Sequence, residues 1–190
     1  MPDRLYLSLW LRGFAEGAIL GRLETLLGVF PFSRQRPGIS ALRIYALEFA
    51  EPALFEQLFA GEPDIETVIG LAGEFHNPDC AYVVEGWWDL WQYRSAGWEL
   101  APARVTLICF GPEFDNEVGD HLRIELGTDL DFLPRPEAPQ SARRMHSNLQ
   151  SVVRLARDLE QALPMERRRL WTESGEDLAA RLEEVADELE

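Results

Sequence analysis

The stretch AYVVEGWWDLWQY, residues 81–93, decides the fold that we expect, because strand-forming residues alternate along it around three tryptophans. Successive side chains of a β-strand point to opposite faces of the sheet. One face then carries large apolar residues that are typical of a protein core, with Trp88 among them. The residues on that face are Tyr82, Val84, Gly86, Trp88, Leu90 and Gln92. The stretch therefore predicts a long strand whose first face packs under helices.

The second face of the same strand has a different composition, because aromatic and acidic side chains share it. Beyond Val83 its residues are Glu85, Trp87, Asp89, Trp91 and Tyr93. Two earlier strand patterns add Trp10, Arg43 and Tyr45 on their less apolar sides. If helices cover only the first face, these eight residues lie on an open surface whose composition is typical of interaction surfaces. We therefore predict a binding surface there.

The alternative interpretation is that helices cover the second face as well. Trp87 and Trp91 then belong to the core, where a buried indole N–H needs a hydrogen-bond acceptor. Glu85 and Asp89 are the neighbouring carboxylates that could accept such a bond. The pattern leaves both interpretations open.

The rest of the chain places this strand in an α+β fold. Period-two patterns predict five strands, at residues 5–11, 41–49, 81–93, 103–110 and 121–133. Apolar stripes of helical spacing and helix-starting prolines predict five helices, at residues 14–28, 52–60, 63–75, 141–163 and from 174 onward. We expect a mixed or mostly antiparallel five-stranded sheet with the helices packed on one face and a helical hairpin at the C-terminus.

The C-terminal hairpin is predicted from proline content and from charge. A proline-rich linker, residues 134–140, separates a sheet domain at residues 1–133 from a helical pair at residues 141–190 packed on the same domain. Residues 141–172 carry seven arginines and three acids, whereas residues 173–190 carry one arginine and eight acids. This complementarity favours two helices packed side by side. The alternatives are an acidic tail helix that binds a partner and a homo-oligomer formed through these helices.

The net charge of −15 argues against several classes of partner. Nucleic-acid binding needs clustered positive charge, and an anionic membrane surface repels an acidic protein. The charge instead favours a basic protein partner, because a negative field accelerates its approach. All 18 basic residues are arginine, so the chain offers no lysine as a nucleophile or Schiff base.

Two further patterns concern the cellular compartment. The sequence contains no run of 18 apolar residues, and its first residues, MPDRLYLSLWLRGF, lack the pattern of a signal peptide. Cys80 and Cys109 lie far apart in the sequence. We therefore expect a cytoplasmic protein whose thiols are free.

The patterns for catalysis and metal binding are weak. The residues with zinc-ligand chemistry are His76, Cys80, Cys109 and His121. They include no CxxC pair, and Pro78 breaks any helix that would align the first two of them. His121, Arg123 and Glu125 alternate along one strand, which favours a solvated sheet face over an acid–base site. We predict no catalytic residue, no metal ligand and no cofactor.

The composition therefore predicts a non-catalytic protein-interaction module, comparable to inhibitors and immunity proteins, that uses the aromatic and acidic sheet face. The alternative is a protein that binds a small molecule or a carbohydrate, since indole rings stack on sugar rings. In that case Arg43, Glu85 and Asp89 bind hydroxyl groups or act as acid and base. A deep pocket on this face favours the alternative, and a flat face counts against it.

Overall fold

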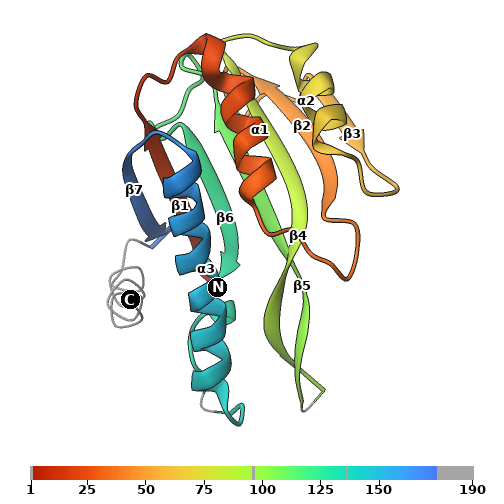
Figure 1. The fold of residues 1–190 in the computed structure, drawn as a ribbon, viewed down its shortest axis with the longest axis vertical. Helices are drawn as coiled ribbons and strands as arrows, with labels where there is room; N and C mark the ends of the chain where they lie inside the picture. Colours follow the sequence, from red (N-terminus) through yellow and green to blue (C-terminus); the bar gives the residue numbers. More distant parts are fainter. Residues whose placement is uncertain (1, 96, 136, 175–190) are drawn as a thin grey trace.

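A seven-stranded antiparallel sheet forms the centre of the fold (Figure 1). The structure is a computed structural model, and it describes residues 2–95, 97–135 and 137–174. The strands are β1 (Arg4–Leu11), β2 (Ile39–Ala46), β3 (Phe55–Leu58), β4 (Cys80–Arg94), β5 (Gly97–Phe110), β6 (Leu122–Thr128) and β7 (Met165–Thr172). They lie in the order β3-β2-β4-β5-β6-β1-β7, and every neighbouring pair is antiparallel.

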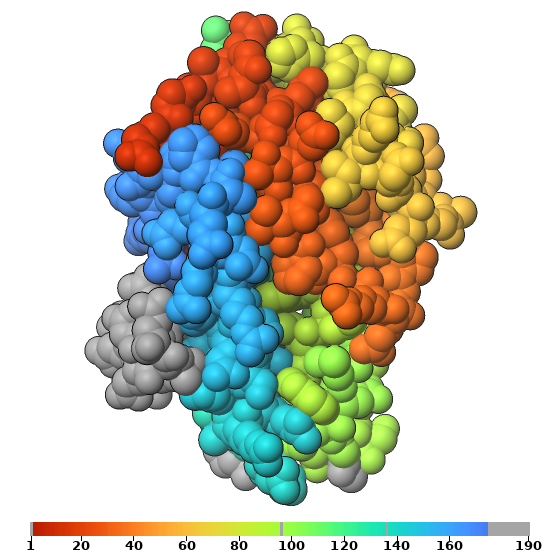
Figure 2. All heavy atoms as spheres, viewed as in Figure 1, coloured from red at the N-terminus to blue at the C-terminus, as the bar shows by residue number. Residues whose placement is uncertain are grey.

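Three α-helices pack on one face of this sheet, and Figure 2 shows them side by side from that face. They are α1 (Ile19–Val29), α2 (Ile65–Gly73) and α3 (Ser141–Ala162), with short 3₁₀ helices η1 (Glu16–Ala18) and η2 (Asp129–Asp131). The sheet side chains beneath them form one apolar core, in which Trp88 is 1% exposed. The prediction that Trp88 lies in the core is confirmed. The second face of β4 points away from the helices as far as Trp87, whereas α3 contacts Trp91 on the same face.

Local sequence explains where the helices lie. The apolar stripe of α1 places Ile19, Leu23 and Leu26 against the sheet, where each is 0% exposed. Helix α2 begins after Asp64, whose side chain accepts a hydrogen bond of 2.7 Å from the Thr67 amide. A carboxylate at this position satisfies an amide that the helix leaves unpaired and offsets the helix dipole.

The predicted five-stranded sheet is wrong, because two further segments pair with its edges. Residues 52–60, predicted as a helix, contain β3, which pairs with β2. The amides of Leu54 and Phe59 extend this ladder by donating to main-chain oxygens of β2 at 2.8 and 3.0 Å. The chain after Pro164 forms β7, which pairs with β1. Tertiary pairing outweighs local helix propensity in a segment as short as β3.

The predicted C-terminal helical hairpin is also wrong as a description of the fold. Helix α3 begins at Ser141 as predicted, but the chain then returns to the sheet as β7. The second helix of the hairpin was expected from residue 174, and residues 175–190 lie outside the described part of the chain. Over the described residues, the fold is α+β with a seven-stranded antiparallel sheet and three α-helices.

Candidate binding site on the open sheet face

The sheet face opposite the helices carries the candidate site, and we call it the open face. In the ranges that the structure describes, the helices pack on the other face (Figure 1). Loop side chains cover one end of the open face, where Phe49 lies against Tyr45, Phe110 and Phe114. The remainder of the open face is hollowed.

A cavity of about 840 Å³ occupies this hollow. Its lining comes from strands β1 to β6 and from the loops before and after β2. Its charged residues are four arginines and two glutamates: Arg4, Arg36, Arg43, Arg104, Glu85 and Glu125. The cavity therefore has an excess of positive charge, although the whole chain carries a net charge of −15.

Trp87 lies at one end of the cavity between two guanidinium groups. The guanidinium carbon of Arg36 is 3.8 Å from the centroid of the indole ring, and that of Arg104 is 5.3 Å from it. Arg104 faces Trp87 across the β4–β5 ladder, whereas Arg36 comes from the loop on the β2 side. Both distances are in the range of cation–π attraction.

Gly86 of β4 allows the Arg36 loop to approach this strand closely. A Cβ atom at Gly86 would lie 2.4 Å from the main-chain oxygen of Gly38, so no other residue fits at position 86 without a shift. The Trp87 amide donates to this same oxygen at 2.8 Å. The loop is also tied by Ser33, whose amide donates to the Trp87 oxygen at 2.7 Å. The guanidinium of Arg36 is thus carried by a hydrogen-bonded loop.

The four arginines of the cavity differ in their partners. Arg43 forms ion pairs with Glu56 and Glu85, and Arg4 forms one of 3.2 Å with Glu125. Among the described residues, Arg36 and Arg104 form no ion pair, and their recorded contact is the Trp87 ring. Two positive charges at the Trp87 end of the cavity are therefore not balanced by a carboxylate.

Burial also changes the pKa of Glu125, one of the two carboxylates that line the cavity. Partial burial raises the pKa of Glu125, because desolvation disfavours the charged form, and the nearby Arg4 opposes this shift. The guanidinium of Arg4 in turn has its pKa raised by the charge of Glu125. This pair keeps the β6 side of the cavity close to neutral.

Four of the eight predicted binding residues line the cavity. They are Arg43, Tyr45, Glu85 and Trp87. The carboxylate of Asp89 instead anchors the Arg36 loop, because it accepts hydrogen bonds from the Ser33 hydroxyl at 2.6 Å and from the Arg34 amide at 3.1 Å. Trp10 lies elsewhere, with the Arg167 guanidinium of β7 3.8 Å from its ring centroid.

The remaining two predicted residues, Trp91 and Tyr93, lie near the tip of the β4–β5 hairpin. They line a separate cavity of about 110 Å³. The guanidinium of Arg144 on α3 is 3.7 Å from the Trp91 ring centroid. Asn148 of α3 binds both main-chain groups of Trp91, at 2.8 and 2.9 Å. Helix α3 therefore covers Trp91, and Trp87 and Trp91 do not form one surface.

Sequence reasoning missed Arg4, Arg36, Arg104 and Glu125. Arg104 could have been found, because a hairpin turn between β4 and β5 sets the register that places it opposite Trp87. Arg36 lies in a loop, where neither strand nor helix periodicity indicates a direction. No signal in the sequence places it near the indole.

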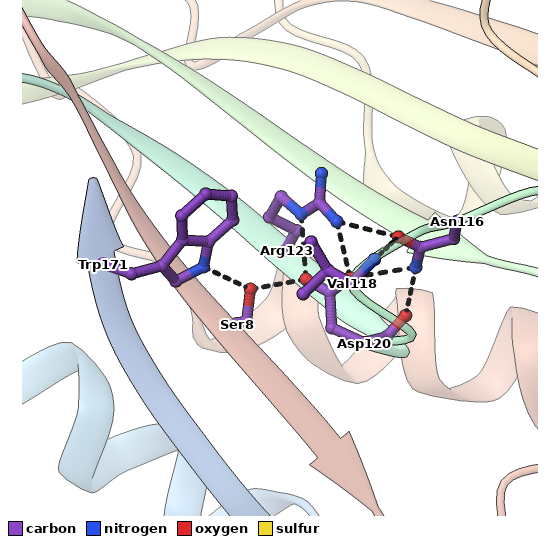
Figure 3. Close-up of polar contacts among 6 residues, drawn as sticks. All are labelled: Ser8, Asn116, Val118, Asp120, Arg123 and Trp171. Atoms are coloured by element: carbon purple, nitrogen blue, oxygen red, sulfur yellow. Dashed lines mark hydrogen bonds and ion pairs between the residues drawn. The ribbon is translucent and has the colours of Figure 1, made fainter. Parts of the chain in front are cut away.

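A buried polar network joins β1, β6 and β7 beyond the cavity (Figure 3). Asp120 is 1% exposed, and its carboxylate accepts hydrogen bonds from Ser8, Arg123 and Asn116. The Trp171 indole donates to the Ser8 hydroxyl at 2.9 Å. Ser8 is 0% exposed, so a ligand in the cavity does not reach its hydroxyl. The network satisfies its buried groups internally, which is typical of a structural role.

The residues that alternate along β6 do not converge on one site. Arg123 belongs to the buried network, and Glu125 pairs with Arg4. The ring of His121 stacks on Phe14, with centroids 4.4 Å apart, and its Nδ1 accepts a hydrogen bond from the Leu11 amide at 2.9 Å. Burial lowers the pKa of His121, while the charges of nearby acids oppose the shift.

The four residues with zinc-ligand chemistry are separated. His76 contacts the Glu16 oxygen, and the Cys109 thiol points to the Ile19 oxygen. Among the described residues, no three His, Cys, Asp or Glu side chains lie together in a cluster that could hold a metal ion. Burial raises the pKa of the Cys80 thiol to about 11 and raises that of Cys109 further. Both thiols are therefore poor nucleophiles in the folded state.

Comparison with known proteins finds no matching family model, no significantly similar curated protein and no significantly similar solved structure. Among the residues described, no helix is both long enough and apolar enough to cross a membrane.

Proposed function

We propose that this protein is a non-catalytic binding module that takes a small ligand into the cavity on its open face. The observation that carries this proposal is the cavity itself. Its volume of about 840 Å³ lies in the range of small-molecule sites, and convergent polar groups line it.

The lining of the cavity supports binding rather than catalysis. It contains no His or Cys. Its carboxylates, Glu85 and Glu125, are engaged by Arg43 and Arg4. General acid–base catalysis needs a group that is free to exchange a proton with the substrate, and both carboxylates are occupied by ion pairs within the protein.

A protein-interaction module is the second candidate, favoured by exposed apolar side chains beside the cavity. Leu54 and Leu58 at β3 are 53% and 61% exposed, and Phe49 is 44% exposed. Large exposed apolar groups that lie together mark interaction sites. A basic partner would be attracted by the net charge of −15 and could dock on this side of the sheet.

Under either candidate we place the protein in the cytoplasm. The free, buried thiols of Cys80 and Cys109 support this compartment, because a reducing environment keeps cysteines unpaired.

Filling the cavity tests the first candidate. Thr106 lies on the cavity floor, so Thr106→Trp places a bulky ring where the ligand would sit. A thermal-shift screen of wild-type protein against neutral oligosaccharides, amino acids, organic acids and phosphate esters should find a class that raises the Tm. We expect Thr106→Trp to lose this increase and Ala142→Trp, at an exposed position of α3, to keep it.

A screen in which no class raises the Tm contradicts small-ligand binding, as does equal stabilisation of Thr106→Trp. The second candidate has its own test, affinity capture with wild-type protein and with Leu54→Asp/Leu58→Asp. A partner that both proteins retain equally counts against docking at β3.

A further inference from the structure

We propose that the ligand of the cavity is a small organic anion whose carboxylate or phosphate group binds at the Trp87 end, to the guanidinium groups of Arg36 and Arg104 that flank the indole ring. This inference rests on the proposed function and adds the chemistry of the ligand. It also differs from the expectation drawn from overall charge, because an acidic protein presents a cationic subsite.

The first argument is the charge balance at the Trp87 end of the cavity. Arg36 and Arg104 both lie within 5.3 Å of one ring centroid, and neither forms an ion pair with a residue that the structure describes. Glu85 and Asp89 lie two residues either side of Trp87 on β4, but their carboxylates are engaged by Arg43 and by Ser33 and the Arg34 amide. Two positive charges that flank one ring and have no carboxylate partner attract an anion to this end of the cavity.

The second argument is the hydrogen-bonding capacity of the two side chains. A guanidinium group has five N–H donors in a planar arrangement that matches the oxygen atoms of a carboxylate or a phosphate. The cation–π contact with Trp87 orients each group without using those donors. Both arginines therefore keep N–H groups available for an oxyanion.

The third argument is that the subsite is built before a ligand binds. The Arg36 loop is fixed to β4 by main-chain hydrogen bonds of 2.7 and 2.8 Å and by the carboxylate of Asp89. Arg104 is fixed by the strand register opposite Trp87. A site whose donors are already in place loses less entropy when it binds a ligand.

The fourth argument concerns the part of the ligand that carries the anion. Glu85 lies two residues before Trp87 on β4 and pairs with Ala41 of β2. Ala41 in turn pairs with Leu58 of β3. Leu58, which is 61% exposed, thus gives the cavity an apolar edge on the β3 side, in a row that lies about 7 Å along the strands from the Trp87 row. An apolar or aromatic body attached to the anionic group would lie along it.

Matched probes test this inference. Isothermal titration calorimetry at low salt would use phenylacetate, phenyl phosphate, the neutral phenylacetamide and the cationic phenethylamine. These probes share an aromatic body and differ in the charged group. We expect at least one anionic probe to bind, with affinity that falls as salt increases, and we expect the neutral and cationic probes to bind at least tenfold more weakly.

Three variants locate the binding. Arg36→Gln and Arg104→Gln each remove one guanidinium and should weaken the anionic probe by about tenfold or more. Arg154→Gln removes an exposed arginine of α3 and should leave the affinity unchanged. Circular dichroism and the unfolding midpoint of each variant identify any change in affinity that comes from misfolding. Trp87→Phe supplies a second test, because it removes the indole and keeps both arginines.

The outcomes separate this inference from the proposed function. Equal binding of phenylacetamide and phenylacetate, blocked by Thr106→Trp, would overturn the anion subsite and leave the cavity as a binding site. No binding of either anionic probe, or equal binding by Arg36→Gln and Arg104→Gln, overturns the subsite as well. Preference for phenyl phosphate over phenylacetate, or the reverse, supports the subsite and identifies the anionic group.

Discussion

Arginine–tryptophan contacts recur on the side of the sheet that the sequence marks as aromatic. Trp10, Trp87 and Trp91 each have a guanidinium carbon within 4 Å of the ring centroid. A guanidinium stacks on an indole face more readily than an ammonium does, and the chain contains arginine as its basic residue throughout. These contacts cover indole surface that would otherwise face water.

The two cysteines give a prediction at the scale of single residues. Cys80 and Cys109 are each 0% exposed, and burial raises the pKa of both thiols. We expect neither thiol to react with Ellman's reagent in native protein at pH 8, and both to react after denaturation in guanidinium chloride. Rapid reaction of one thiol in native protein would contradict the burial of that residue.

A second prediction concerns the carboxylate at the centre of the buried network. Asp120→Ala leaves the Arg123 guanidinium buried without its ion-pair partner, and we expect a loss of about 3–5 kcal/mol in the free energy of unfolding. Urea denaturation measures this change. Asp115→Ala removes an exposed acid of the same loop and should cost less than about 0.5 kcal/mol. Similar losses for the two variants would contradict a structural network.

At the scale of secondary-structure elements, long and apolar patterns were predictable and short or charged ones were not. Strand β4 alternates over its whole length, and helices α1 and α3 have clear stripes, so their positions follow from periodicity. Strand β3 has only four residues, and β7 contains three consecutive arginines. Such segments become strands because a neighbouring strand offers a free edge, which no local pattern contains.

The same contrast applies to the candidate site. Its strand residues, Arg43, Tyr45, Glu85 and Trp87, could be placed on one face by alternation. The loop residue Arg36 could not, since its position depends on hydrogen bonds between the loop and β4. Trp91 shares the alternation of Trp87, but the covering helix α3 comes from a distant part of the chain.

The contact between α3 and the β4–β5 hairpin gives a prediction at this scale. Asn148 is 1% exposed, and its amide group binds the main chain of Trp91 and the main-chain oxygen of Asp131. Asn148→Ala leaves these buried groups without partners, so we expect it to cost about 2–4 kcal/mol of unfolding free energy. Amide hydrogen exchange at Trp91 should also accelerate. Ser147→Ala, the neighbouring position, should change neither quantity appreciably.

At the scale of the whole molecule, the sheet separates two functions. The helices close one face and form the apolar core, while the other face holds the cavity. The cavity also differs in charge from the chain as a whole. The net charge is −15, yet Arg36 and Arg104 at one end of the cavity form no ion pair with a described residue.

The stability of the whole domain should depend on pH through His121. Burial lowers the pKa of this residue below 6.5, so the unfolded chain binds more protons than the folded one between the two pKa values. The contribution is fully present above pH 6.5 and is lost as the pH falls through that window. His121→Phe keeps the contact with Phe14, and we expect its unfolding free energy to decrease less than that of wild type between pH 7.5 and pH 5.5. Parallel pH profiles of the two proteins would contradict this prediction.

The central claim is that an anionic ligand binds at the Trp87 end of the open face. The indole N–H resonances of the six tryptophans in a ¹H–¹⁵N spectrum test it most directly, with Trp87 assigned from the spectrum of Trp87→Phe. We predict that phenylacetate or phenyl phosphate shifts the Trp87 resonance to saturation and leaves the resonance of the buried Trp88 nearly unchanged. A titration in which the Trp87 resonance does not move, or in which a neutral probe moves it equally, would contradict the claim.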